Sequence, residues 1–253
     1  MKTLQLILTA LLLAGTVLSY GQRNKKTEEA FYTFDENWKD APVEKSKYMI
    51  RRMKISDTCW QWDTYNLYGP MIKSEQYIDE KGSLAHGRTV IYNAKGKLDS
   101  VCYYSNGYPN GTWYIYNDPF YFIEQTYNMG VLVNTKQTVK VKGTQPKDSV
   151  KPDEKESEFK GGLADWQRYL NRNLRYPQRA VKANIQGNVT IAFAIDTIGN
   201  VQDCYVWSSV EFSLDEEALR IIRDSPGWIP AQKAGQLKKS YKRQPIVFRL
   251  PSR

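Results

Sequence analysis

The stretch Ile185-Gln-Gly-Asn-Val-Thr-Ile-Ala-Phe-Ala-Ile-Asp-Thr-Ile-Gly-Asn-Val201 decides the fold of the C-terminal part of this 253-residue chain. Large apolar residues stand at alternate positions in it, namely Val189, Ile191, Phe193 and Ile195. This period of two is typical of a strand that is buried on one face. Residues 198–200 predict a turn, and residues 201–208 return as a second strand, so the stretch predicts an antiparallel hairpin.

Helical patterns flank this hairpin. The preceding helix has one apolar face, formed by Leu163, Trp166, Leu170 and Leu174. Tyr176-Pro177 ends it, because a residue before proline avoids the helical region, and Pro177 can open a second short helix over residues 178–184.

A third helix follows the hairpin. Ser213 is its expected cap, with Glu216 reaching back to complete a capping box. The buried face of this helix is expected to comprise Leu214, Ala218, Ile221 and Ile222. Ser225-Pro226-Gly227 ends the helix, and Trp228 and Pro230 are expected to close the far end of the core.

A last strand is expected over residues 239–250, with Ile246, Phe248 and Leu250 inward. The predicted class is therefore α+β, a two-layer sandwich of helices and a three-stranded antiparallel sheet. Pro245 has no N–H group, which places its strand at an edge or a strand start, and the basic residues of this strand guard against self-pairing. Such an edge is compatible with accepting a partner strand by β-augmentation.

Residues 45–133 carry tyrosine-rich strands in which part of the sequence pattern is repeated. Residues 86–92 align with residues 110–116, and residues 102–107 align with residues 126–130, at an offset of 23 to 24 residues. This period suits a unit of two strands. Asn106-Gly107 and Asn110-Gly111 predict turns with positive φ angles. The region resembles MORN-type repeats, an antiparallel β-hairpin repeat domain, although an unrelated antiparallel meander is the alternative.

The remaining segments complete the predicted organisation. Residues 1–21 read as a signal peptide, or as an N-terminal anchor if uncleaved, so the chain is expected in the periplasm. Residues 22–44 are read as a mobile lead-in with a short helix, and residues 134–157 as a linker, because they contain few large apolar side chains. The C-terminal domain is expected to cover residues 158–253.

Composition excludes several classes of function. The net charge of +9 would suit a negatively charged partner. Because the chain is expected to be exported, this argues for acidic peptides, anionic lipids or envelope polymers and against nucleic acid. The single histidine, His86, lies in a predicted turn, which argues against catalytic triads and histidine metal sites. We therefore expect no enzyme, no cofactor and no metal. The three cysteines are read as small hydrophobes, with a Cys59–Cys102 bridge left open.

The C-terminal pattern is similar to the C-terminal domain of TonB-type energy transducers over about ninety residues. The similarity rests on Tyr176-Pro177, Arg179-Ala180, the alternating series from Ile185 to Ile195, Gly199 and Val201. Further matching pieces are Phe159, Gly161-Gly162, Trp166, Tyr169-Leu170, Asn173-Leu174, Ser208, residues 214–220, Trp228, Pro230, Pro245-Ile246, Phe248 and Leu250.

This resemblance implies a partner and a site. Domains of this family bind the TonB box, an extended segment of outer-membrane receptors, as a strand added beside the last strand. Carried onto this chain, the binding residues are Arg179, Val181, Lys182, Ala183 and Asn184 of the turn and Tyr241, Arg243 and Val247 of the edge strand. The implied function is support of energy-coupled transmembrane transport by a TonB-like protein that binds outer-membrane transporters.

Two features depart from the family pattern. Family transducers usually keep an uncleaved N-terminal helix that couples to inner-membrane motor proteins, and a long proline-rich span. This chain has a signal that looks cleavable and a short linker, so motor partners are implied only if the N-terminus is uncleaved. The alternative function is a cell-envelope scaffold whose repeat domain binds a protein or polymer. A homodimer is also left open.

Overall fold

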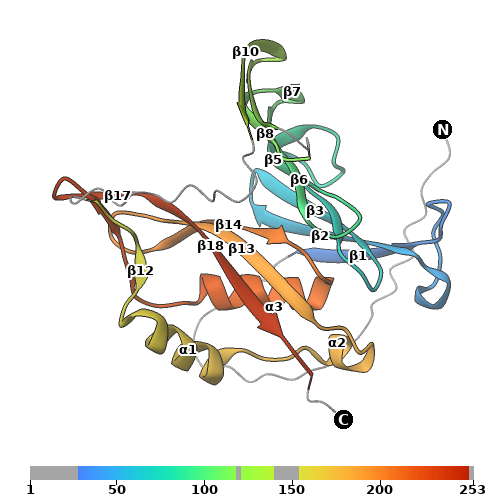
Figure 1. The fold of residues 1–253 in the computed structure, drawn as a ribbon. Coiled ribbons are helices and arrows are strands. Elements are labelled where there is room, and N and C mark those ends of the chain that lie inside the picture. The colour runs from blue at the N-terminus through green and yellow to red at the C-terminus, as the bar shows by residue number, and fades with distance from the viewer. Residues whose placement is uncertain (1–27, 118–120, 140–153, 251–253) are drawn as a thin grey trace.

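The computed structural model describes residues 28–117, 121–139 and 154–250. A large N-terminal sheet and a C-terminal α+β unit pack against each other and share a core (Figure 1). Within these ranges no helix is long and apolar enough to span a membrane. The predicted signal over residues 1–21 lies outside the described residues.

The N-terminal sheet is an antiparallel meander of ten strands in which chain neighbours pair. Its strands are β1 (Glu29–Phe34), β2 (Tyr48–Ser56), β3 (Cys59–Asn66), β4 (Met71–Tyr77), β5 (Ala85–Tyr92), β6 (Leu98–Ser105), β7 (Tyr108–Pro109), β8 (Gly111–Ile115), β9 (Tyr121–Asn128) and β10 (Val131–Val139). A 3-10 helix, η1 (Val43–Lys45), connects the first two strands. Because each pairing joins strands near in sequence, the sheet forms through local contacts.

The sheet is longer at both ends than the sequence predicted. Strand β1 pairs with β2, where a mobile lead-in was expected over residues 22–44. Strand β10 runs past residue 133 to Val139, into the expected linker, and within the described ranges it pairs with β9 alone. In both cases the neighbouring strand supplies backbone partners that local composition does not reveal.

The two copies of the repeated sequence pattern fold as equivalent antiparallel pairs, β5 with β6 and β8 with β9. Gly87 and Gly111 occupy matching places near the start of β5 and β8, and both have positive φ angles, of 100° and 84°. Asn106 and Gly107 have the positive φ angles predicted for their turn. The equivalence supports an internal repeat, while kinship with MORN-type repeats stays a prediction.

The three cysteines are free thiols, so the open alternative of a Cys59–Cys102 bridge is not formed. Cys102 is buried, and burial raises its thiol pKa to about 11. Cys204 lies half-buried on a strand of the C-terminal unit. All three therefore occupy places that suit small apolar side chains better than reactive ones.

The C-terminal unit has the predicted order of elements. Its main elements are α1 (Gly162–Asn173), α2 (Gln178–Lys182), β13 (Gly187–Ile195), β14 (Val201–Ser208), α3 (Phe212–Arg223) and β18 (Ser240–Phe248). Short strands surround them: β11 (Glu154–Lys155), β12 (Glu158–Phe159), β15 (Trp228–Ile229), β16 (Ala231–Lys233) and β17 (Gln236–Lys238). The main sheet has the order β14-β13-β18, with both pairings antiparallel.

The core of this unit follows the predicted periodicities. The inward residues of β13 and the apolar face of α3 are buried, as are Ile246 and Phe248. Trp228 also closes the core as predicted, with its ring 5.5 Å from that of Phe159. Of the predicted face of α1, Leu163 was predicted wrongly, because it is 75% exposed. Trp166 is buried against Phe159 and Trp228 as predicted, and Leu170 and Leu174 pack partly buried against the core.

The start of α3 also differs from the capping-box prediction. Glu211 is the N-cap, and its carboxylate accepts hydrogen bonds from the backbone N–H of Ser213 at 2.8 Å and from the Ser213 hydroxyl at 2.6 Å. Glu216 forms an ion pair with Arg51 of β2 at 2.6 Å instead of reaching back. The N-terminal sheet therefore engages a side chain that local sequence assigned to the helix cap.

The N-terminal sheet packs against the β14 side of the C-terminal unit, where it contacts both β14 and the start of α3. Tyr116 packs edge-on against Trp207 of β14, and the Tyr92 hydroxyl donates to the Val206 carbonyl at 2.5 Å. The small residues Ala192 and Ala194, which were expected opposite the large ones, are also buried. The two predicted layers of helices and sheet thus have the N-terminal sheet packed beside them, next to β14 (Figure 1).

Candidate functional site

The site predicted from sequence lies along β18, the edge strand of the C-terminal sheet. Its register with β13 runs without a shift from Gly187 opposite Phe248 to Ile195 opposite Ser240. The opposite edge of β18 pairs with no other strand in the part of the chain that the structure describes. One row of backbone groups is therefore open to a further strand.

The other outer strand, β14, is less accessible. A bridge joins Ser208, at its end, to Lys97 in the β5–β6 turn, and the Ser209 N–H donates to the Gly96 carbonyl at 2.8 Å. The Met71 N–H in turn donates to the Ser209 hydroxyl at 2.7 Å. The N-terminal sheet thus covers one end of this edge, which leaves β18 as the better candidate for strand addition.

The predicted edge-strand residues Tyr241, Arg243 and Val247 alternate along one face of β18. Tyr241 is 77% exposed and Val247 is 44% exposed, so both are accessible to a partner. The Arg243 guanidinium lies 4.6 Å from the ring centroid of Trp207, on the sheet face that the N-terminal domain adjoins. Arg243 therefore links the edge strand to the interface between the two parts of the chain.

The predicted turn residues lie at the Phe248 end of the same edge. Val181, Lys182, Ala183 and Asn184 are all exposed, and Asn184 has a positive φ of 52°. The Ala180 carbonyl accepts from the Ile185 N–H at 2.9 Å, which fixes this turn just before β13. The ring of Tyr176 packs against Phe248, so the turn and the end of β18 are held together.

Arg179 has a different environment from the other turn residues. Its guanidinium pairs with Glu211 at 2.6 Å, donates to the Leu67 carbonyl and lies 4.6 Å from the Tyr68 ring centroid. Glu211 is fully buried. Arg179 therefore joins α2 to the N-terminal sheet and to the cap of α3, and its predicted contact with a partner peptide stays a prediction.

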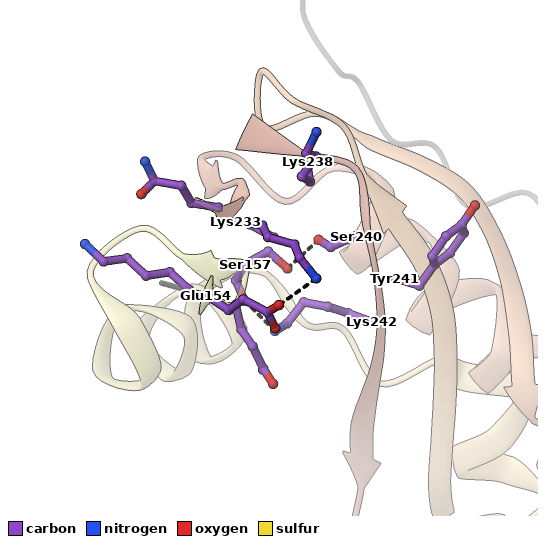
Figure 2. A pocket seen from close by; sticks show the side chains of 11 residues that line it. Glu154, Ser157, Lys233, Lys238, Ser240, Tyr241 and Lys242 are labelled. Atoms are coloured by element: carbon purple, nitrogen blue, oxygen red, sulfur yellow. Dashed lines mark hydrogen bonds and ion pairs between the residues drawn. The ribbon is translucent and has the colours of Figure 1, made fainter. Parts of the chain in front are cut away.

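The Ser240 end of the edge adjoins a cavity of about 380 Å³. The cavity lies between the start of β18 and the segment around β11, and Figure 2 shows Lys242 reaching across it to Ser157. The hydroxyls of Ser240 and Ser157 are 2.8 Å apart. The segment pairs with β16 through β11, and within the described residues it is joined to β18 by side-chain hydrogen bonds and not by strand pairing.

A buried polar cluster lies where the two parts of the chain meet. The Asp215 carboxylate accepts from the Tyr65 hydroxyl at 3.2 Å, from the Ser209 hydroxyl at 2.5 Å and from the Val210 N–H at 3.0 Å. Burial raises the pKa of Asp215 to about 8, although these donors oppose the shift. Burial also raises the pKa of the nearby Asp63.

Residues 172–250 match the family described as Gram-negative bacterial TonB protein C-terminal. The match covers α2, the main sheet and α3, and therefore the whole open edge. This part of the chain is therefore similar to the C-terminal part of Gram-negative TonB proteins, which supports a TonB-like role in transport energy coupling.

One solved structure also matches about a third of the chain. The NMR solution structure of the Helicobacter pylori TonB C-terminal domain is 25% identical, covering 36% of this chain and 82% of that one, with a TM-score of 0.29. No curated protein matches the chain.

The sequence did not reveal the residues that lie beside the β18 edge, nor those that join the N-terminal sheet to the C-terminal unit. Ser157 and Glu154 were assigned to a linker, and no buried role was predicted for Asp215. The lysines of residues 233–242 were visible as a local excess of basic residues. No signal in the sequence placed Ser157 beside β18 or Asp215 against Tyr65, because both contacts join segments that are distant in the chain.

Proposed function

We propose that this protein binds the TonB box of an outer-membrane TonB-dependent receptor as a strand added to β18, and thereby supports energy-coupled transport from the periplasmic side. The observation that carries the proposal is the unshifted nine-residue β18, which pairs on one edge only among the strands that the structure describes. Backbone hydrogen bonds would supply affinity, and the alternate exposed side chains of β18 would supply specificity.

Two further observations support this choice of edge. The exposed turn over residues 181–184 lies at one end of β18 and Tyr241 lies at the other, so an extended peptide would meet predicted contacts along the whole strand. A nine-residue strand is about 30 Å long at roughly 3.3 Å per residue. This length suits a short extended segment.

The test is a calorimetric titration of the full chain with a receptor TonB-box peptide at several salt concentrations. Two further peptides carry N-methyl groups on alternate residues, one set on the odd positions and one on the even positions. Because only every second N–H of an added strand faces its neighbour, one set should abolish binding and the other should be tolerated. Binding that is indifferent to both sets would overturn strand addition.

A cell-envelope scaffold remains the second candidate function, favoured by the exposure of β10. All nine residues of this outer strand are exposed, including Val131, Leu132, Val133 and Val139. No described strand pairs with the outer edge of β10, and an exposed edge with a run of apolar residues is a site for association. This candidate predicts that Leu132→Lys abolishes capture of an envelope component while the TonB-box titration is unchanged. Capture that survives Leu132→Lys would argue against it.

A further inference from the structure

The cavity at the Ser240 end of β18 is rich in lysine. Its lining comprises Glu154, Lys155, Glu156, Ser157, Ala231, Gln232, Lys233, Lys238, Ser240, Tyr241 and Lys242. Four of these residues are lysines and two are glutamates, so the lining carries an excess of positive charge. A partner group with negative charge would therefore be favoured there over a neutral one.

The lysines are only partly neutralised by the protein. Lys233 forms an ion pair with Glu154 at 2.7 Å. Among the described residues, Lys155, Lys238 and Lys242 form no ion pair, and Lys238 donates only to the Gln236 side-chain oxygen at 2.9 Å. Lys242 donates to the Ser157 carbonyl. An ammonium group has three N–H donors, so Lys242 retains donors for a carboxylate.

The cavity is also placed where an added strand would reach it. Ser240 and Lys242 are on one face of β18 and both contact Ser157 across the cavity. A strand laid about 4.8 Å from β18 would run past this opening, with alternate side chains on the same face as Lys242. Ser157 is buried and Lys242 is half-buried, so a carboxylate here would be partly shielded from water.

We propose that this lysine-lined cavity makes the edge selective for partner segments with acidic side chains at the end that lies beside Ser240 and Lys242. The proposal rests on strand addition as the proposed function and names the chemistry of the segment that is added. Backbone pairing then supplies affinity along the rest of β18, and the lysines set which end of the partner lies at the cavity.

The test uses the full chain and three peptides that share the core of a receptor TonB box. One peptide carries two glutamates before the core, the second carries them after it, and the third has glutamine at all four positions. One glutamate peptide, and not the other, should bind about threefold to tenfold more tightly than the glutamine peptide at low salt, which is the range of two partly exposed ion pairs. This preference should shrink as salt is raised.

Protein variants then locate the effect. Lys238→Gln with Lys242→Gln should remove the preference, while Lys95→Gln, an exposed lysine in the β5–β6 turn, should retain it. Equal binding of all three peptides, or a preference that survives the double variant, would overturn the acidic selectivity and leave strand addition standing. Failure of every peptide to bind would overturn both proposals.

Discussion

Asp215 should make the folded protein lose stability as pH rises through the neutral range. Its pKa in the folded protein is about 8, against an ordinary value of 3.8, because burial penalises the charged form. Between these two values the folded protein keeps a proton that the unfolded chain has released. Stability from this group is therefore greatest below pH 4 and decreases until about pH 8.

The magnitude follows from the linkage relation. One proton of difference changes the free energy of unfolding by about 1.4 kcal/mol per pH unit, so Asp215 can contribute a loss of up to roughly 2.7 kcal/mol between pH 5 and pH 7. Asp215→Asn has no ionisable group at this position and should lack that slope. The Tyr65 and Ser209 hydroxyls can rotate from donating to accepting, so most of the hydrogen bonding should survive.

The assay is urea denaturation of the full chain and of Asp215→Asn at pH 5, 6 and 7. Asp63, whose pKa is also raised by burial, contributes to both proteins and cancels in the difference. Asp196→Asn is the matched control. Hydrogen bonds from the backbone of Asn200 and its neighbours lower the pKa of this exposed aspartate. Asp196 therefore changes the pH dependence of stability only below its ordinary pKa of 3.8, outside the range of the assay. Parallel curves for the wild type and Asp215→Asn would refute the reasoning.

Two further predictions concern the junction between the two parts of the chain. Gly96→Ala should destabilise the protein by about 1–3 kcal/mol or more in urea denaturation, because φ is +71° and the new Cβ would lie 2.2 Å from the Ser209 carbonyl oxygen. The control is Gly235→Ala, because Gly235 has a similar φ of +78° but no atom within 4 Å of a new Cβ. An equal loss of stability in both variants would show that the contact with Ser209 plays no role. Arg179→Met should cost about 1–3 kcal/mol because it leaves Glu211 buried without its partner, and adding Glu211→Gln should recover part of this loss. An unchanged denaturation midpoint in the single variant would contradict the second prediction.

The open edge could be predicted from the sequence in outline. Pro245 and the alternation of Ile246 and Phe248 with exposed residues mark a half-buried strand at the edge of a small sheet. Tyr241 and Val247 are exposed as a binding role requires. The lysine-lined cavity could not be predicted, because its walls come from segments around residues 154, 231 and 240 that only the folded chain brings together.

Local physics explains what the sequence by itself determined. Side-chain periodicity specified β13, its hairpin with β14, the buried face of α3 and the core position of Trp228, because each depends on residues a few positions apart. Tertiary structure decided the rest. It turned Arg179 and Glu216 toward the N-terminal sheet and made Glu211 the cap of α3. It also formed β1 where a lead-in was expected and extended β10 into the expected linker. These outcomes depend on charges and backbone groups that find their partners across long sequence separations, which no local pattern records.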